Sequence, residues 1–303
     1  MYWNDLNSRL KTQYDCKVYK LALSSGCSCP NRDGTLGDRG CIFCDGSGAF
    51  AETGDIPAQL AAARARVAAK AGPDARYIAY FQSFTNTYGS VDRLRSLFQA
   101  AMEPADVVIL SIATRPDCLG PEVRALLAEL NRIKPVWVEL GLQTIHPKSA
   151  AYIRRGYDLP VFDAAVKSLK ALGITVIVHQ ILGLPGETPE MMAATSRYIG
   201  TSGADGIKLH LLHVLRNTDL AAEWQAGRVR ALELNEYISI LELCLRNLPP
   251  ELVIHRLTGD GAKRDLLAPL WSGDKKRVLN AIHQAFRRDD LIQGSALARP
   301  FLD

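Results

Sequence analysis

The chain has 303 residues, 48% of them hydrophobic, and a formal net charge of +4 at pH 7. This length allows one large core, and so mild a charge neither requires nor excludes a nucleic-acid partner. The polar N-terminus gives no sign of a signal peptide, and no apolar run reaches the length of a membrane span. Seven cysteines, several of them clustered, favour metal ligands over disulfides, so we expect a cytoplasmic protein.

Nearly continuous apolar strands alternate with amphipathic helices along the chain. Strands are expected at 17–23, 76–81, 106–113, 136–142, 175–182, 206–212 and, as a seventh candidate, 252–257. Helices are expected at 55–70, 90–102, 121–133, 160–172, 189–202, 220–226, 232–248 and 275–288. This rhythm predicts a parallel sheet covered by helices, and no Gly-x-Gly-x-x-Gly follows the first strand as a dinucleotide-binding fold would require.

The predicted fold is therefore α/β, a partial β/α (TIM-like) barrel of about six parallel strands with a short helical C-terminal extension. We place the barrel at residues 1–248 and the extension at 249–303. In such a barrel the chemistry lies at the C-terminal ends of the strands. The chain has polar side chains after each expected strand, which is where a site would form.

Four cysteines lie in the loop after the first expected strand: Cys27, Cys29, Cys41 and Cys44. All four could hold a structural zinc ion, although Cys27-x-Cys29 is tighter than the usual spacer. Cys41 and Cys44 alone could form a redox dithiol. Cys29, Cys41 and Cys44 could instead hold a 4Fe-4S cluster with one iron open to a further ligand. Spacing alone leaves zinc and iron–sulfur equally open.

The segment Cys29-Pro-Asn-Arg-Asp-Gly-Thr, with Cys41-Ile-Phe-Cys44 after a gap of eleven residues, resembles the radical S-adenosylmethionine superfamily. It is most similar to the Elongator-subunit-like branch and, within it, to a group of short bacterial proteins. The resemblance implies a 4Fe-4S cluster on these three cysteines, with S-adenosylmethionine chelating the open iron and cleaved to a 5′-deoxyadenosyl radical. It also implies an external electron donor such as flavodoxin or ferredoxin. Cys27 has no place in the pattern.

The same resemblance assigns further residues to S-adenosylmethionine. They are Gln82, Ser83, Thr85, Ser111, Thr114, Glu139, Gln143, Arg155, His179, Gly183 and Pro185. Relatives carry a glycine run near Ser83 and a glutamate near Ala113, so this chain departs from the family at both places. A buried ion pair is the alternative role for Glu139, because an unpaired carboxylate in a buried strand is costly. Arg155 matches a family arginine that pairs with the cofactor carboxylate.

Candidate substrate contacts follow from the later strands: Lys208, His210, His213, His255 and Arg256. Alternation places Lys208 and His210 on one face of their strand, with His213 opposite unless the strand has ended. A basic patch could meet phosphates at the entrance of the site. It consists of Arg256, Lys263, Arg264, Lys275, Lys276 and Arg277.

The resemblance implies tRNA as the partner, and wobble-uridine modification as the reaction. The short bacterial group resembles enzymes that shorten a carboxymethylaminomethyl side chain to aminomethyl. Two alternatives remain open at this point. One is a radical enzyme acting on a small molecule such as a tetrapyrrole, and the other is a non-catalytic zinc-binding or RNA-binding module.

Overall fold

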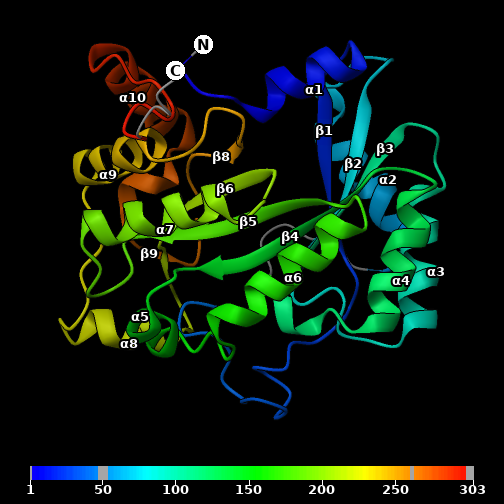
Figure 1. The fold of residues 1–303 in the computed structure, drawn as a ribbon, viewed down its shortest axis with the longest axis horizontal. Coiled ribbons are helices and arrows are strands. Elements are labelled where there is room, and N and C mark those ends of the chain that lie inside the picture. The colour runs from blue at the N-terminus through cyan, green and yellow to red at the C-terminus, as the bar shows by residue number, and fades with distance from the viewer. Residues whose placement is uncertain (1, 47–53, 260–262, 298–303) are drawn as a thin grey trace, which may run out of the picture.

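The computed structural model describes residues 2–46, 54–259 and 263–297. Its main sheet has seven parallel strands in the order β1-β2-β3-β4-β5-β6-β8 and curls into a half-barrel (Figure 1). The strands are β1 Val18–Ser24, β2 Arg76–Ser83, β3 Val107–Thr114, β4 Val136–Gln143, β5 Thr175–Leu182, β6 Gly206–Leu211 and β8 Val253–Arg256. The predicted partial barrel is confirmed, and the candidate strand at 252–257 completes it.

Helices cover the convex face of the sheet. The larger ones are α2 Ile56–Val67, α3 Val91–Met102, α4 Pro121–Asn131, α6 Leu159–Ala171, α7 Pro189–Thr201 and α9 Leu234–Arg246. Several of these helices begin after a polar N-cap residue and have a proline in the first turn, where the missing proline N–H leaves no helical hydrogen bond unmade. Asp55 accepts from the Ala58 amide at 2.8 Å at the start of α2, and Thr188 caps α7 in the same way.

Alternation along each strand separates two environments. On β4, Val136, Val138, Leu140 and Leu142 are buried against the helices in the main core. Trp137 and the other inward residues face the interior of the half-barrel, where a smaller apolar group lies. The period of two therefore places the polar side chains of the strands in the concave interior.

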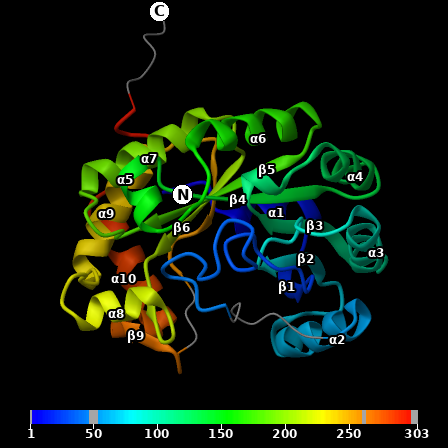
Figure 2. The same ribbon diagram turned by 90° about the horizontal axis from the view of Figure 1, so that it is seen from below.

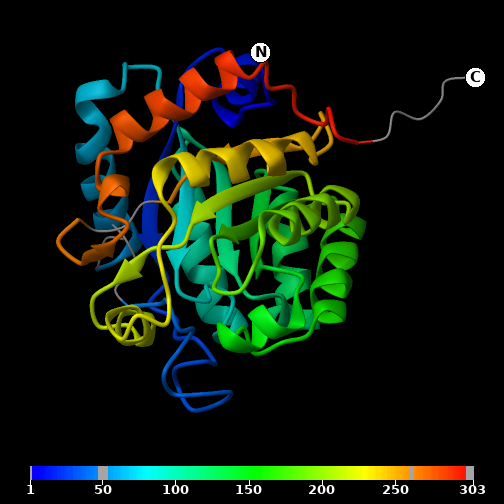
Figure 3. The same ribbon diagram turned by 90° about the vertical axis from the view of Figure 1, so that its left-hand side faces the viewer.

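The two ends of the half-barrel differ (Figure 3). At one end, α1 Leu6–Tyr14 lies with α10 Lys275–Arg288, and the ring of Trp3 is 5.2 Å from that of Phe286. The loop that carries the cysteines lies at the other end, where it covers the concave side of the sheet (Figure 2). The helix expected at 275–288 is confirmed, whereas the division at residue 248 stays a prediction.

The remaining elements are short. An antiparallel pair, β7 Val214–Leu215 and β9 Leu266–Ala268, was not expected from the sequence. The others are α5 Pro147–Tyr152, α8 Asp219–Gln225 and the 3₁₀ turns η1 Ala68–Lys70, η2 Pro116–Cys118 and η3 Leu270–Gly273. Within the described residues, no helix has the length and apolar character needed to cross a membrane.

Candidate functional site

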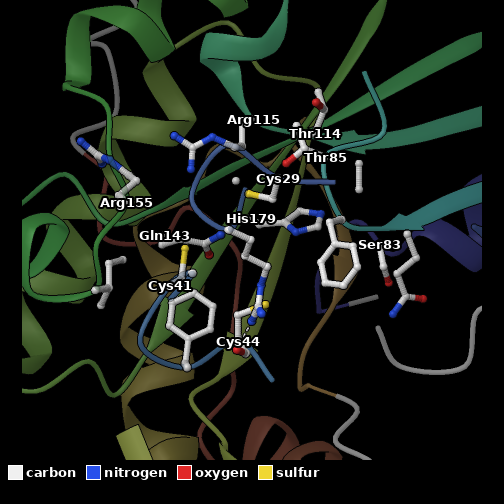
Figure 4. Close-up of a pocket in the computed structure, with 18 of the residues that line it drawn as sticks. Cys29, Cys41, Cys44, Ser83, Thr85, Thr114, Arg115, Gln143, Arg155 and His179 are labelled. Atoms are coloured by element: carbon white, nitrogen blue, oxygen red, sulfur yellow. Dashed lines mark hydrogen bonds between the residues drawn. The ribbon is translucent and has the colours of Figure 1, made fainter. Parts of the chain in front are cut away.

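Three of the four clustered cysteines share one cavity. Cys29, Cys41 and Cys44 line a space of about 270 Å³ at the C-terminal ends of the strands, and their thiols approach one region of it (Figure 4). Cys27 is instead 4% exposed within the main core, on the side of Gly89 and α3. The structure thus separates Cys27 from the other three.

The cysteine loop, residues 25–46, is folded around Arg32. Its guanidinium donates to the carbonyl of Cys44 and lies 5.7 Å from the centre of the Phe84 ring. Gly40 and Gly46 have φ values of 73° and 77°, and a Cβ on either would come within 2.8 Å of this side chain. Only glycine meets both requirements, so these two positions let the loop close around Arg32.

The loop is also fastened to the barrel. Asn31 donates to the carbonyl of Arg154 at 2.7 Å, and the Arg154 guanidinium donates to the carbonyl of Gly40 at 3.3 Å. Arg154 also pairs with Asp219, the first residue of α8. The turn after α5 and the start of α8 therefore hold the segment that carries Cys41.

The placement of the three thiols fits a cluster. Cys29, Cys41 and Cys44 line one cavity, and in a 4Fe-4S cluster each thiolate binds a different iron. Burial, with nearby Cys44, raises the pKa of the Cys41 thiol to about 11, so a bound metal would be needed to keep it as thiolate.

Most of the predicted cofactor residues line the same cavity as the three cysteines. They are Gln82, Ser83, Thr85, Thr114, Glu139, Gln143, Arg155 and His179. Ser111 lies behind Glu139, to which its hydroxyl donates at 2.9 Å. Gly183, with φ 91° and packed against Leu232, and Pro185 are in the turn between β5 and α7. The topology brings together residues from four different strands, while their contacts to the cofactor stay predictions.

Glu139 is fully buried at the centre of a charged network. It pairs with Lys208, lies 3.6 Å from the Nζ of Lys20 and accepts from His179 Nε2 at 2.8 Å. Burial opposes its ionisation, but the charges of Lys208 and Lys20 and the His179 hydrogen bond hold its pKa well below the usual range. Glu139 is therefore an ionised, ion-paired residue that also faces the cavity.

The imidazoles of the interior are neutral. Burial, reinforced by the charge of Lys208, lowers the pKa of His179 to about 4. Because Nε2 donates to Glu139, the Nδ1 of His179 is left as an acceptor. The ring of His210 lies 5.0 Å from that of His179, and burial lowers its pKa well below the usual value.

Two arginines on the cavity flank the ring of Tyr157. Arg115 lies 5.4 Å from the ring centre and is held by both carboxylate oxygens of Asp117, at 2.9 and 2.7 Å. Arg155 lies 4.6 Å from the same ring and donates to the carbonyl of Thr144 at 2.6 Å. Neither Arg115 nor Tyr157 was predicted as a site residue from the sequence, although Arg115 directly follows the polar end of β3.

The five candidate substrate residues lie in three different places. Lys208 is buried and forms an ion pair with Glu139, and His210 lies beside His179. His213 follows the end of β6, where its ring packs against Gly259. His255 and Arg256 line a second cavity, on the edge strand β8.

Sequence comparison identifies the family. Residues 33–199 match the Radical SAM superfamily model, and residues 204–288 match the Radical_SAM C-terminal domain. YtqA of Bacillus subtilis is 41% identical over 301 residues, which cover 98% of this chain and 93% of YtqA. YhcC of Escherichia coli K12 is 38% identical over 303 residues, which cover 100% of this chain and 96% of YhcC.

More distant relatives include a tRNA uridine(34) acetyltransferase of Dehalococcoides mccartyi. It is 27% identical over 175 residues, which cover 57% of this chain and 37% of that protein. The archaeal Methanocaldococcus infernus Elp3 has the same fold, with a TM-score of 0.70 and 18% identity over 91% of this chain and 64% of that one. A 4Fe-4S cluster and S-adenosylmethionine are the cofactors typical of the family matched here. The chain belongs to the radical S-adenosylmethionine superfamily.

Proposed function

We propose that this enzyme holds a 4Fe-4S cluster on Cys29, Cys41 and Cys44 and cleaves S-adenosylmethionine to modify the wobble uridine of tRNA. The bound cofactors supply a carbon-centred radical that abstracts hydrogen from an unreactive C–H bond. The observation that carries the proposal is the common cavity of the three thiols and the strand-end residues. An external electron donor such as flavodoxin or ferredoxin and a cytoplasmic location complete the proposal.

Different residues of the cavity are proposed to bind different parts of S-adenosylmethionine. Arg155, which lines the cavity with Arg115, is proposed to bind the carboxylate of S-adenosylmethionine, since a guanidinium matches a carboxylate in shape and charge. His179 and Gln143 offer hydrogen-bonding groups for the ribose. The turn that contains Gly183 and Pro185 is proposed to contact the adenine. The loop and the half-barrel together keep water away from the reacting atoms.

The proposed reaction is oxidative removal of the carboxymethyl group from a carboxymethylaminomethyl side chain on uridine. One hydrogen atom would pass to the radical and one further electron to the cluster, and water would then break the carbon–nitrogen bond, releasing glyoxylate and leaving aminomethyl. The similarity to tRNA uridine(34) acetyltransferases supports tRNA as the substrate. The predicted basic patch, in which Arg256 and Lys275 line the second cavity, offers positive charge for phosphates. We propose that residues 1–248 perform the chemistry and that residues 249–303, which include the last strand of the half-barrel, β8, help to bind the substrate.

The test is nucleoside profiling of tRNA from a strain that lacks the gene, followed by complementation. We expect the aminomethyl-type wobble uridines to fall and the carboxymethylaminomethyl precursor to accumulate. Wild-type protein should restore the profile, and Cys29→Ala should not. An unchanged profile in the deletion strain, with S-adenosylmethionine still cleaved by the purified protein, would direct the search to a small-molecule substrate.

A further inference from the structure

A second cavity lies between the two edge strands of the half-barrel. It measures about 360 Å³ and is bordered by residues of α1 and α10. Its lining includes the basic residues Lys20, Arg256 and Lys275, together with His255 and apolar side chains such as Trp3 and Leu10. β1 and β8 are the first and last strands of the sheet, so this is where the half-barrel is open at its side.

The charges around this cavity are mostly positive. Lys20 comes from β1, whereas Arg256 and Lys275 come from β8 and α10, more than 200 residues later in the chain. Among the described lining residues Asp5 is the one acid, and its carboxylate already accepts from the Ser8 amide at 3.1 Å as the cap of α1. The fold thus concentrates cations at one opening, where they raise the affinity for an anion.

Lys20 connects this cavity to the one that Cys29, Cys41 and Cys44 line, called the cofactor cavity below. Its Nζ lies 3.6 Å from Glu139, which lines the cofactor cavity and is also paired with Lys208. Two ammonium groups therefore share one carboxylate across the wall between the cavities. The pKa of Lys20 is lowered by burial, although Glu139 opposes the shift, so a second negative charge would stabilise its ammonium form.

His255 supplies a further polar group at this place. Its Nδ1 is buried and has no hydrogen-bond partner within the part of the chain that the structure describes. The ring lies 5.3 Å from that of Trp137, with its other edge toward Gly206. A buried imidazole nitrogen without a partner is costly, and a hydrogen-bonding ligand would remove that cost.

We propose that the cavity between β1 and β8 binds an oxyanion group of the substrate, a carboxylate or a phosphate, on Lys20 and Arg256. The inference rests on the proposed function in treating this ligand as the substrate. Lys20 then acts as the specificity-determining residue, because it contacts the oxyanion on one side and the Glu139 network of the cofactor cavity on the other. An anionic substrate enters through the side opening between β1 and β8. The side chain of Lys20 then lies between its charged group and Glu139, which lines the cofactor cavity.

Isothermal titration calorimetry tests this proposal. Inorganic phosphate and acetate are titrated separately, at constant ionic strength, into the full-length protein with its cluster and without S-adenosylmethionine. The variants are Lys20→Met and Arg256→Met, with Lys167→Met as a control that removes one positive charge from the exposed side of α6. We expect the cavity variants to weaken binding of the preferred oxyanion about tenfold or more, as removal of a charged hydrogen-bond donor predicts, and the control to stay within about twofold.

The two probes distinguish the source of the oxyanion. Tighter phosphate binding indicates a phosphate group on the substrate, and tighter acetate binding indicates a carboxylate. The proposal is overturned if neither probe binds, or if Arg256→Met, at a half-buried position on the rim, binds as tightly as wild type. Cleavage of S-adenosylmethionine is measured separately, so a protein that binds the oxyanion without cleaving the cofactor would overturn the proposed function alone.

Discussion

Cys27 and Cys29 lie two residues apart, yet their side chains have different surroundings. Cys27 is buried in the main core, where a Cβ on Gly89 would lie 3.4 Å from its sulfur. Cys29 lines the cofactor cavity with Cys41 and Cys44. We therefore propose that Cys27 serves packing and that the other three thiols hold the cluster.

Alanine variants at Cys27 and Cys29 form a matched pair for this assignment. Cys27→Ala should keep about four irons and four sulfides per chain after anaerobic reconstitution, because its thiol is outside the cavity. It should lose about 1–2 kcal/mol of stability, since it leaves a small hole in the core. Cys29→Ala should lose the cluster. Iron and sulfide analysis with the visible absorption spectrum provides the measurement, and loss of the cluster in Cys27→Ala would contradict the three-ligand assignment.

The sequence identified the cavity residues that match a family pattern. It did not identify residues that reach the cavity only through tertiary contacts. Glu139 and His179 were found because strand alternation and resemblance agree. Tyr157 was missed because it lies in a turn and reaches the site only through the two arginines beside it. Lys20 could have been found, because it alternates with Leu21 and Leu23, which pack in the main core beneath the helices, so its side chain faces the concave interior.

At the scale of elements, the cysteine loop depends on contacts made by the turn after α5 and by α8. Arg154 joins them: it pairs with Asp219 on α8, donates to Gly40 in the loop and accepts from Asn31 through its carbonyl. Arg39 lies 3.5 Å from the same Asp219 carboxylate. Two arginines thus meet one carboxylate, which fastens the loop to the scaffold.

Asp219→Asn should loosen this attachment without unfolding the protein. The pairs are partly exposed, so we expect a loss of about 0.5–1 kcal/mol and a two- to fivefold faster release of cluster iron to a chelator. Glu223→Gln is the matched control, because it removes a carboxylate from the same helix, where its partner is Arg228. The rate of iron release is followed by absorbance of the chelate. Equal rates in the two variants would show that the Asp219 pairs do not restrain the loop.

The regular helices and strands were predictable because their apolar periodicity is long. The helix at 275–288 and the strand at 175–182 match their expected bounds. The strands β7 and β9 have two and three residues, too few for a period to be recognised, and their pairing joins segments about fifty residues apart. Their existence follows from tertiary contacts that no local pattern encodes.

At the scale of the whole molecule, the half-barrel has a charged interior where many barrels have an apolar one. Glu139 meets two lysines and His179 there, and the phenol of Tyr80 lies 3.1 Å from the Nζ of Lys208. Breaking such a buried pair leaves an uncompensated charge and is strongly destabilising. The network therefore makes the stability of the fold depend on the protonation of its interior.

His179 should make the protein sensitive to acid. Its pKa is lowered to about 4 by burial and by Lys208, whereas an imidazole in the unfolded chain titrates near 6.5. Between these values the unfolded chain binds a proton that the folded protein does not, so the free energy of unfolding falls as the pH falls through this window and levels off below about pH 4. The charged and titratable groups around it are Glu139, Lys208, His210 and Arg256.

Urea unfolding at pH 7 and pH 5 measures this contribution in wild type and in His179→Gln. The wild-type protein should lose about 2 kcal/mol more than the variant between the two pH values, because only its ring can take up the proton on unfolding. Acid effects on the cluster and on the other interior histidines occur in both proteins and cancel in the comparison. Equal losses in the two proteins would mean that the ring of His179 is already protonated in the folded state, in which case Glu139 would be paired with three cations rather than two.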